Sequence, residues 1–73
     1  MLEKEEILTL DNNKEYVVVS TLDYDNSHYV YLINIKDKKD FMFCKFENNG
    51  LIKITDNNLV ERLMHLFVEK MGA

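Results

Sequence analysis

The chain has 73 residues, of which 47% are hydrophobic, and its formal net charge at pH 7 is −4. This length predicts a single domain, residues 1–73, and excludes a large core, because one core in so short a chain supplies only about 3–5 kcal/mol. The nine lysines and arginines are scattered between acidic residues instead of forming a stripe, which argues against a nucleic-acid-binding protein.

The first half of the chain predicts two β-hairpins. A short apolar run at residues 7–10 and a longer one at 15–22 predict two strands, and the run DNNK between them favours a turn. Residues 23–27 (DYDNS) predict the next loop. If Leu22 pairs with His28 across this loop, Ser20 pairs with Val30 and Val18 with Leu32, which places the third strand centrally.

The middle of the chain predicts a third hairpin. Residues 28–35 (HYVYLINI) and 41–46 (FMFCKF) are rich in β-branched and aromatic residues, and the charged run KDKKD joins them. We expect Ile35 to face Phe41. The run NNG at residues 48–50 then predicts a three-residue turn with Gly50 at the position of positive φ. Glu47 would face Leu51, and Cys44 would face Ile54.

The C-terminal segment predicts one amphipathic helix. Thr55 or Asp56 provides an N-cap, and Gly72 ends the helix. Apolar residues cover about half of its circumference. They are Leu59, Val60, Leu63, Met64, Leu66, Phe67, Val68 and Met71. A flat sheet does not cover so broad an arc, so the sheet must curl around the helix or a second chain must contribute.

These elements predict an α+β fold, a curled five-stranded antiparallel meander in the order 1-2-3-4-5 with one C-terminal helix packed on one face. Period-two alternation predicts one sheet face without charges. It consists of Val18, Val30, Leu32, Met42, Cys44, Phe46, Ile52 and Ile54. We assign the helix to this uncharged face.

The opposite face is rich in aromatic residues and is left without a cover. It consists of Leu8, Val17, Val19, Tyr29, Tyr31, Ile33, Phe41 and Phe43. An exposed apolar patch with tyrosines is typical of a protein interface. The predicted partner-binding residues are Val17, Val19, Tyr29, Tyr31, Ile33, Phe41 and Phe43, and the expected partner is a second copy of the chain or another protein.

Candidate catalytic groups are few. Cys44 with His28 or His65 is the one pairing that suggests a thiol nucleophile, but Cys44 lies among apolar residues, where a thiol is inert. We therefore predict a protein that is not an enzyme. A small enzyme that uses Cys44 and a histidine remains an alternative. A second alternative is an acidic decoy that blocks a basic site on a partner, which the net charge of −4 suggests.

Ligand motifs are weak. The sequence has no CxxC or HxxxH spacing for a metal, and the acidic start DYDN lacks the glycine and glutamate of a calcium loop. No glycine-rich phosphate loop occurs. We expect no metal and no cofactor. The longest apolar run is far shorter than the about 18 residues of a membrane span, and the acidic N-terminus MLEKEE is unlike a signal peptide, so we expect a cytoplasmic protein that does not bind a membrane.

The pattern of apolar positions and turns extends over nearly the whole chain. Its segments are ILTLD at residues 7–11, YVVV at 16–19, SHYVYL at 27–32, FMFCKF at 41–46 and GLIKITD at 50–56, before the amphipathic helix. This pattern resembles the YrzB-like family of small uncharacterised bacterial proteins. The resemblance implies a cytoplasmic bacterial protein of unknown activity, with no catalytic residues to transfer to this sequence.

Overall fold

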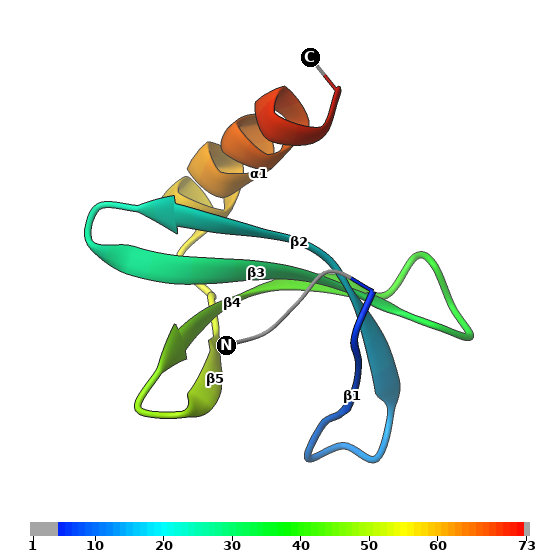
Figure 1. The fold of residues 1–73 in the computed structure, drawn as a ribbon. Helices are drawn as coiled ribbons and strands as arrows, with labels where there is room; N and C mark the ends of the chain where they lie inside the picture. The colour runs from blue at the N-terminus through cyan, green and yellow to red at the C-terminus, as the bar shows by residue number, and fades with distance from the viewer. Residues whose placement is uncertain (1–4, 73) are drawn as a thin grey trace.

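The fold is an antiparallel sheet with one helix, seen in a computed structural model that describes residues 5–72. Five strands follow one another in the order β1-β2-β3-β4-β5, and the C-terminal helix completes the α+β fold (Figure 1). The elements are β1 (Ile7–Thr9), β2 (Glu15–Tyr24), β3 (Ser27–Asn34), β4 (Phe41–Glu47), β5 (Gly50–Lys53) and α1 (Asn57–Gly72). The predicted fold class is confirmed. Within residues 5–72, no helix combines the length and apolar character that crossing a membrane requires.

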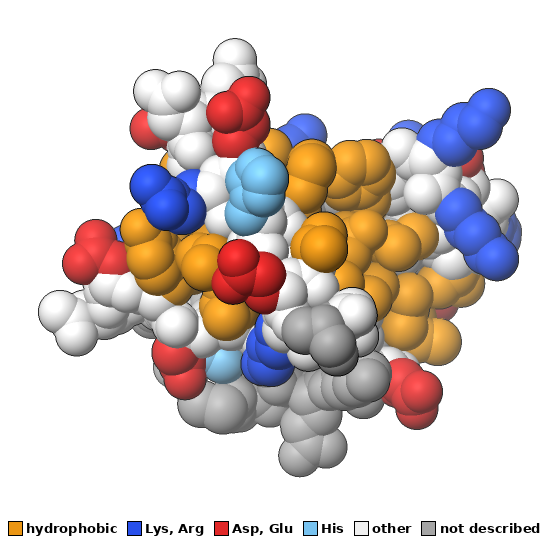
Figure 2. Space-filling model, turned by 90° about the horizontal axis from the view of Figure 1, so that it is seen from above, with side chains coloured by type: hydrophobic (Ala, Val, Ile, Leu, Met, Phe, Trp, Pro, Cys, Tyr) orange, Lys and Arg blue, Asp and Glu red, His pale blue; other side chains and the backbone are white. Residues whose placement is uncertain are grey.

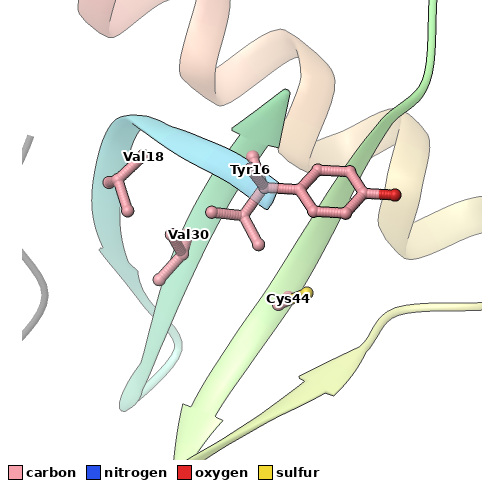
Figure 3. Packing of buried hydrophobic residues seen from close by; sticks show 5 residues of the cluster. Tyr16, Val18, Val30 and Cys44 are labelled. Carbon is pink, nitrogen blue, oxygen red and sulfur yellow. The ribbon is translucent and has the colours of Figure 1, made fainter. Parts of the chain in front are cut away.

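The sheet curls, so that its edge strands β1 and β5 descend from the same side of the central strands (Figure 1). The side enclosed by this curl is called the inner face. Its core consists of Tyr16, Val18, Val30, Leu32 and Cys44, with Leu8, Leu10, Met42, Phe46 and Leu51 packed against it. Figure 3 shows Tyr16, Val18, Val30 and Cys44 on this face, contributed by β2, β3 and β4. The inner face is therefore buried largely by the sheet itself.

The helix packs on the opposite side of the sheet, which is called the outer face. Leu63 and Phe67 of α1 are buried against Tyr29 and Phe43. The rings of Phe43 and Phe67 are stacked, with centroids 5.4 Å apart and an interplanar angle of 10°. The sequence-based assignment of the helix to the uncharged face is therefore wrong. The helix covers part of the aromatic face, because curling of the sheet already encloses the other one.

The β4–β5 turn differs from the prediction and changes which residues face the helix. Asn48 and Asn49 both have positive φ, 53° and 63°, and Glu47 pairs with Gly50. The turn therefore has two residues with the left-handed geometry that β-hairpins prefer, and Gly50 does not adopt positive φ. Because a slip of one residue moves every side chain to the other face, Ile54 joins the core on the outer face.

The β2–β3 and β3–β4 pairings also depart from the expected register. Val18 pairs with Leu32 as predicted, but a β-bulge at position 19 shifts the pairs that follow, so Leu22 pairs with Tyr29. The predicted pairs Leu22–His28 and Ser20–Val30 are wrong. Across the central hairpin, Phe41 pairs with Ile33 and not with Ile35. A shift of two residues preserves the faces, so the residues predicted to share a face on β3 and β4 do so.

The helix begins as the sequence predicts. Oδ1 of Asp56 accepts a hydrogen bond from the backbone N–H of Asn58 over 2.9 Å, and the N–H of Leu59 lies 3.5 Å from the same oxygen. Asp56 is thus the N-cap, and its charge lies where the helix dipole favours an anion. Gly72 is the last helical residue. The cap fixes where α1 leaves the sheet, directly after β5.

Candidate functional site

The helix covers only part of the outer face. Val17, Ile33 and Phe41 pair directly across β2, β3 and β4, so their side chains form one row on this face. Phe41 is 44% exposed, and Val17 and Ile33 are half-buried. This row lies at the end of the sheet next to the β3–β4 loop, and it remains accessible in the folded chain.

Tyr31 connects this row to the helix. Its ring centroid lies 6.0 Å from that of Phe41, 5.1 Å from that of Phe43 and 5.7 Å from that of Phe67. Phe43 and Phe67 are buried, whereas Tyr31 is half-buried. The aromatic cluster therefore runs without a break from the protected core under α1 to the exposed ring of Phe41.

One flank of α1 extends the accessible area. Met64, Val68 and Met71 are spaced by four and three residues and so share one side of the helix. They are 43%, 59% and 45% exposed. The Lys70 ammonium donates to the carbonyl of Thr21, whereas Met71 lines the same shallow hollow as Val19. Met71 thus lies near the middle of β2, beside Val19.

The sheet row, Tyr31 and this helix flank together form the outer apolar surface. Its members are Val17, Tyr31, Ile33, Phe41, Met64, Val68 and Met71. Figure 2, which looks onto the helix side of the molecule, shows a broad area of hydrophobic side chains with positively charged side chains along one margin. An exposed apolar area drawn from both a sheet and a helix is typical of a protein interface.

The margins of the outer apolar surface carry opposite charges. The β3–β4 loop, which directly precedes Phe41, contains Lys36, Lys38 and Lys39, and all three are exposed. On the helix, Glu61 is exposed and lies three residues before Met64, on the flank away from the sheet. The loop also contains exposed Asp37, so this end of the surface carries an excess of positive charge, whereas Glu61 places one negative charge beside Met64 at the other end.

The predicted partner-binding residues separate into two groups. Tyr29 and Phe43 are buried beneath α1, with 6% and 4% of their surfaces exposed, so they belong to the intramolecular core. Val17, Tyr31, Ile33 and Phe41 belong to the outer apolar surface. Val19 lies half-buried at the bulge of β2. Leu8, which the sequence placed on the aromatic face, packs on the inner face.

Met64, Val68 and Met71 were not predicted as site residues, because the sequence assigned the whole apolar arc of the helix to the core. The sequence feature that could have identified these residues is the breadth of the apolar arc. Only Leu63 and Phe67 are fully buried in α1. An arc of about half the circumference exceeds what one sheet face covers, so residues at its margin remain exposed.

The candidate catalytic groups are not assembled into a site. Cys44 is 2% exposed on the inner face, and burial raises the pKa of its thiol to about 11. His65 is exposed on α1, on the other side of the sheet. Nδ1 of His28 lies 2.6 Å from Oδ1 of Asp23, and the ring contacts Phe46 edge-on. The thiol is thus protonated at neutral pH, and His28 is engaged by a carboxylate in the β2–β3 hairpin.

Within residues 5–72, no three histidine, cysteine or acidic side chains lie close enough together to hold a metal ion. Comparisons of the chain with protein-family models, curated proteins and solved structures find no match. The resemblance to the YrzB-like family stays a prediction.

Proposed function

We propose that this protein is an interaction module of the cytoplasm that forms a homodimer through its outer apolar surface. The observation that carries the proposal is the continuity of that surface across two elements, with Phe41, Met64, Val68 and Met71 each 43–59% exposed. Tyrosine, phenylalanine and methionine are enriched at the centres of protein interfaces. Burial of this surface against a second copy gives a small chain apolar contact that its own core does not supply.

The arrangement of charge favours a second copy over an unrelated partner. In a dimer whose two-fold axis is perpendicular to the line between the two ends of the interface, each end meets the opposite end of the other chain. The lysines of the β3–β4 loop would then lie against the Glu61 side of the partner helix, and the reverse contact would form as well. The surface is therefore complementary to itself in charge and in apolar character.

Sedimentation velocity on the wild type and on a Phe41→Glu, Val68→Glu double variant tests the apolar contact. We expect the wild type to dimerise at micromolar concentration and the variant to remain monomeric, because each dimer would bury four unpaired carboxylates. Ile52→Glu is the matched control. Ile52 is 50% exposed but pairs with Lys45 near the far end of β4 from Phe41, so this variant should still dimerise.

A charge reversal tests the identity of the partner. Lys38→Glu with Lys39→Glu should weaken the dimer about tenfold, the size expected for a pair of interfacial charges, and Glu61→Lys in the same chain should restore it. A wild type that stays monomeric at high micromolar concentration would overturn the proposal. A dimer whose affinity is unchanged by both the apolar and the charge substitutions would also overturn it.

A further inference from the structure

Two methionines lie on the accessible flank of α1. Met64 and Met71 are 43% and 45% exposed, and both belong to the outer apolar surface. Met42, in contrast, is half-buried on the inner face, where it packs against the inner core. Met1 lies outside the described residues. A small oxidant dissolved in water therefore reaches the two helical thioethers more readily than the thioether of Met42.

Met64 and Met71 border Val68 from opposite sides along the helix. Val68 follows Met64 by four residues and precedes Met71 by three, so the three side chains form a stripe about 10 Å long on one flank. Val68, at 59%, is the most exposed member of the outer apolar surface. The buried residues of α1 are Leu63 and Phe67. A change in polarity at the two sulfur atoms therefore alters the outer apolar surface and leaves the contact of the helix with the sheet in place.

The thioether of methionine reacts with hydroperoxides. A lone pair of the sulfur attacks one oxygen of hydrogen peroxide, and the O–O bond breaks. The second oxygen leaves as hydroxide, which takes the proton of the transferred oxygen and becomes water. The sulfur is thus oxidised by two electrons to a sulfoxide, and the peroxide is reduced. The sulfoxide is polar and accepts hydrogen bonds, so it disrupts apolar interfaces that contain methionine.

We propose that Met64 and Met71 are oxidation sites through which a hydroperoxide controls the dimer. The inference rests on the proposed function, because the dimer would bury both thioethers. Each oxidised dimer would hold four sulfoxide oxygens in an apolar contact, where an acceptor without a hydrogen-bond partner is costly. The dimer would also shield both sulfur atoms, so the monomer is the form that reacts. Oxidation therefore holds the chain as a monomer, and reduction of the sulfoxides lets it dimerise again.

Peroxide treatment followed by peptide mass spectrometry tests where the oxygen is added. In dilute, monomeric protein, we expect Met64 and Met71 to gain an oxygen several-fold faster than Met42. At a concentration where the wild type is dimeric, both should react more slowly, because the interface covers them. The Phe41→Glu, Val68→Glu variant is the matched control. It remains monomeric, so its two helical methionines should react at the same rate at both concentrations.

Sedimentation velocity before and after oxidation tests the effect on the dimer. We expect oxidation to weaken the dimer at least about tenfold, while the circular dichroism spectrum stays unchanged. Methionine sulfoxide reductase with dithiothreitol should restore the dimer, since this class of enzyme reduces the sulfoxide. Dithiothreitol alone should not restore it, which distinguishes the sulfoxides from reversible oxidation of Cys44.

Two double variants separate polarity from shape. Met64→Leu with Met71→Leu keeps the apolar volume and removes both thioethers, so this chain should dimerise before and after peroxide. Met64→Gln with Met71→Gln places polar side chains at the same positions and should be monomeric without peroxide. Met42→Leu should respond to peroxide as the wild type does.

The outcomes distinguish this inference from the proposed dimer. A wild-type dimer whose affinity is unchanged after both sites are oxidised would overturn the inference and leave the dimer standing. The inference would also be overturned if Met42 were oxidised as fast as Met64 and Met71, or if peroxide still dissociated the leucine variant. A wild type that is monomeric before peroxide is added would instead overturn the proposed dimer, and this inference with it.

Discussion

The hydroxyl of Tyr16 donates a hydrogen bond to Oδ2 of Asp40 over 2.6 Å and so joins β2 to the end of the β3–β4 loop. Nδ2 of Asn34 donates to the same oxygen over 3.1 Å, and Nζ of Lys14 lies 4.0 Å from it. These contacts hold the loop that carries the lysines beside the outer apolar surface. The bonds from Tyr16 and Asn34 lower the pKa of Asp40, whereas donation to Asp40 and burial raise the pKa of Tyr16.

The lowered pKa of Asp40 predicts a contribution to acid stability. A carboxyl whose pKa is lower in the folded than in the unfolded chain stabilises the fold above its unfolded value of 3.8. That contribution is lost as the pH falls through the folded value. Asp40→Asn should therefore melt at a lower temperature than the wild type at neutral pH. The difference should shrink as the pH falls below 3.8 and the wild-type carboxyl in turn takes up its proton.

Thermal unfolding followed by circular dichroism across this pH range measures the effect. Tyr16→Phe is the companion variant, because it removes the donor while leaving the ring in the core. Tyr16→Phe should also lose much of the pH-dependent stability that Asp40 contributes. A difference between wild type and Asp40→Asn that stays constant from neutral to acid pH would show that the carboxylate charge is not involved.

Phe67 and Val68 are adjacent in α1, but truncation of Phe67 should cost far more stability than truncation of Val68. Phe67 is 1% exposed and stacks on Phe43, whereas Val68 is 59% exposed. Phe67→Ala should lower the free energy of unfolding by about 3–5 kcal/mol through lost burial and the cavity it leaves. Val68→Ala should change it by less than about 0.5 kcal/mol. Urea unfolding of both variants at a concentration where the chain is monomeric provides the measurement, and equal losses would contradict the placement of the helix.

The sequence predicts the elements and their order well, because strand and helix periodicities differ and every turn is marked by polar residues. It also predicts which residues of β3 and β4 share a face. It does not predict which face the helix covers, because both faces are apolar. Val30 on one face and Tyr31 on the other are equally suited to packing against a helix. That choice depends on the curl of the whole sheet, which no local pattern encodes.

The candidate site was predicted in part for the same reason. Phe41 and Ile33 follow from strand alternation, whereas the exclusion of Phe43 depends on the position of the helix. The bulge at position 19 of β2 could not be predicted from the sequence, because no glycine stands there. The β4–β5 turn was misplaced by one residue because a glycine next to two asparagines favours positive φ at the glycine, although asparagine also tolerates that conformation.

The observed turn predicts that Gly50 accepts a side chain. Gly50 does not have positive φ, and a Cβ there would lie 3.7 Å from the carbonyl oxygen of Glu47, an ordinary contact. Gly50→Ala should therefore keep or raise the stability, by up to about 1 kcal/mol, because alanine restricts the unfolded chain. Asn49→Val is the contrasting variant, since a β-branched residue at a φ of 63° should cost about 1–2 kcal/mol. A large loss from Gly50→Ala would instead support the three-residue turn.

Cys44 should report on opening of the inner core. Burial raises the pKa of its thiol from 9.0 to about 11, which lowers the thiolate fraction near neutral pH by about 100-fold relative to the unfolded chain. Because the folded chain holds this proton more tightly, the thiol contributes stability below pH 9.0 that is lost as the pH rises through about 11. Iodoacetamide should therefore alkylate the native chain at least about 100-fold more slowly than the urea-unfolded chain at mildly alkaline pH, since only the thiolate reacts. Leu32→Ala leaves a cavity in the core that contains Cys44, so it should accelerate alkylation of the native chain, whereas Val68→Ala should not. Equal rates for native and unfolded wild type would show that the thiol is open to solvent and would remove the ground for treating it as inert.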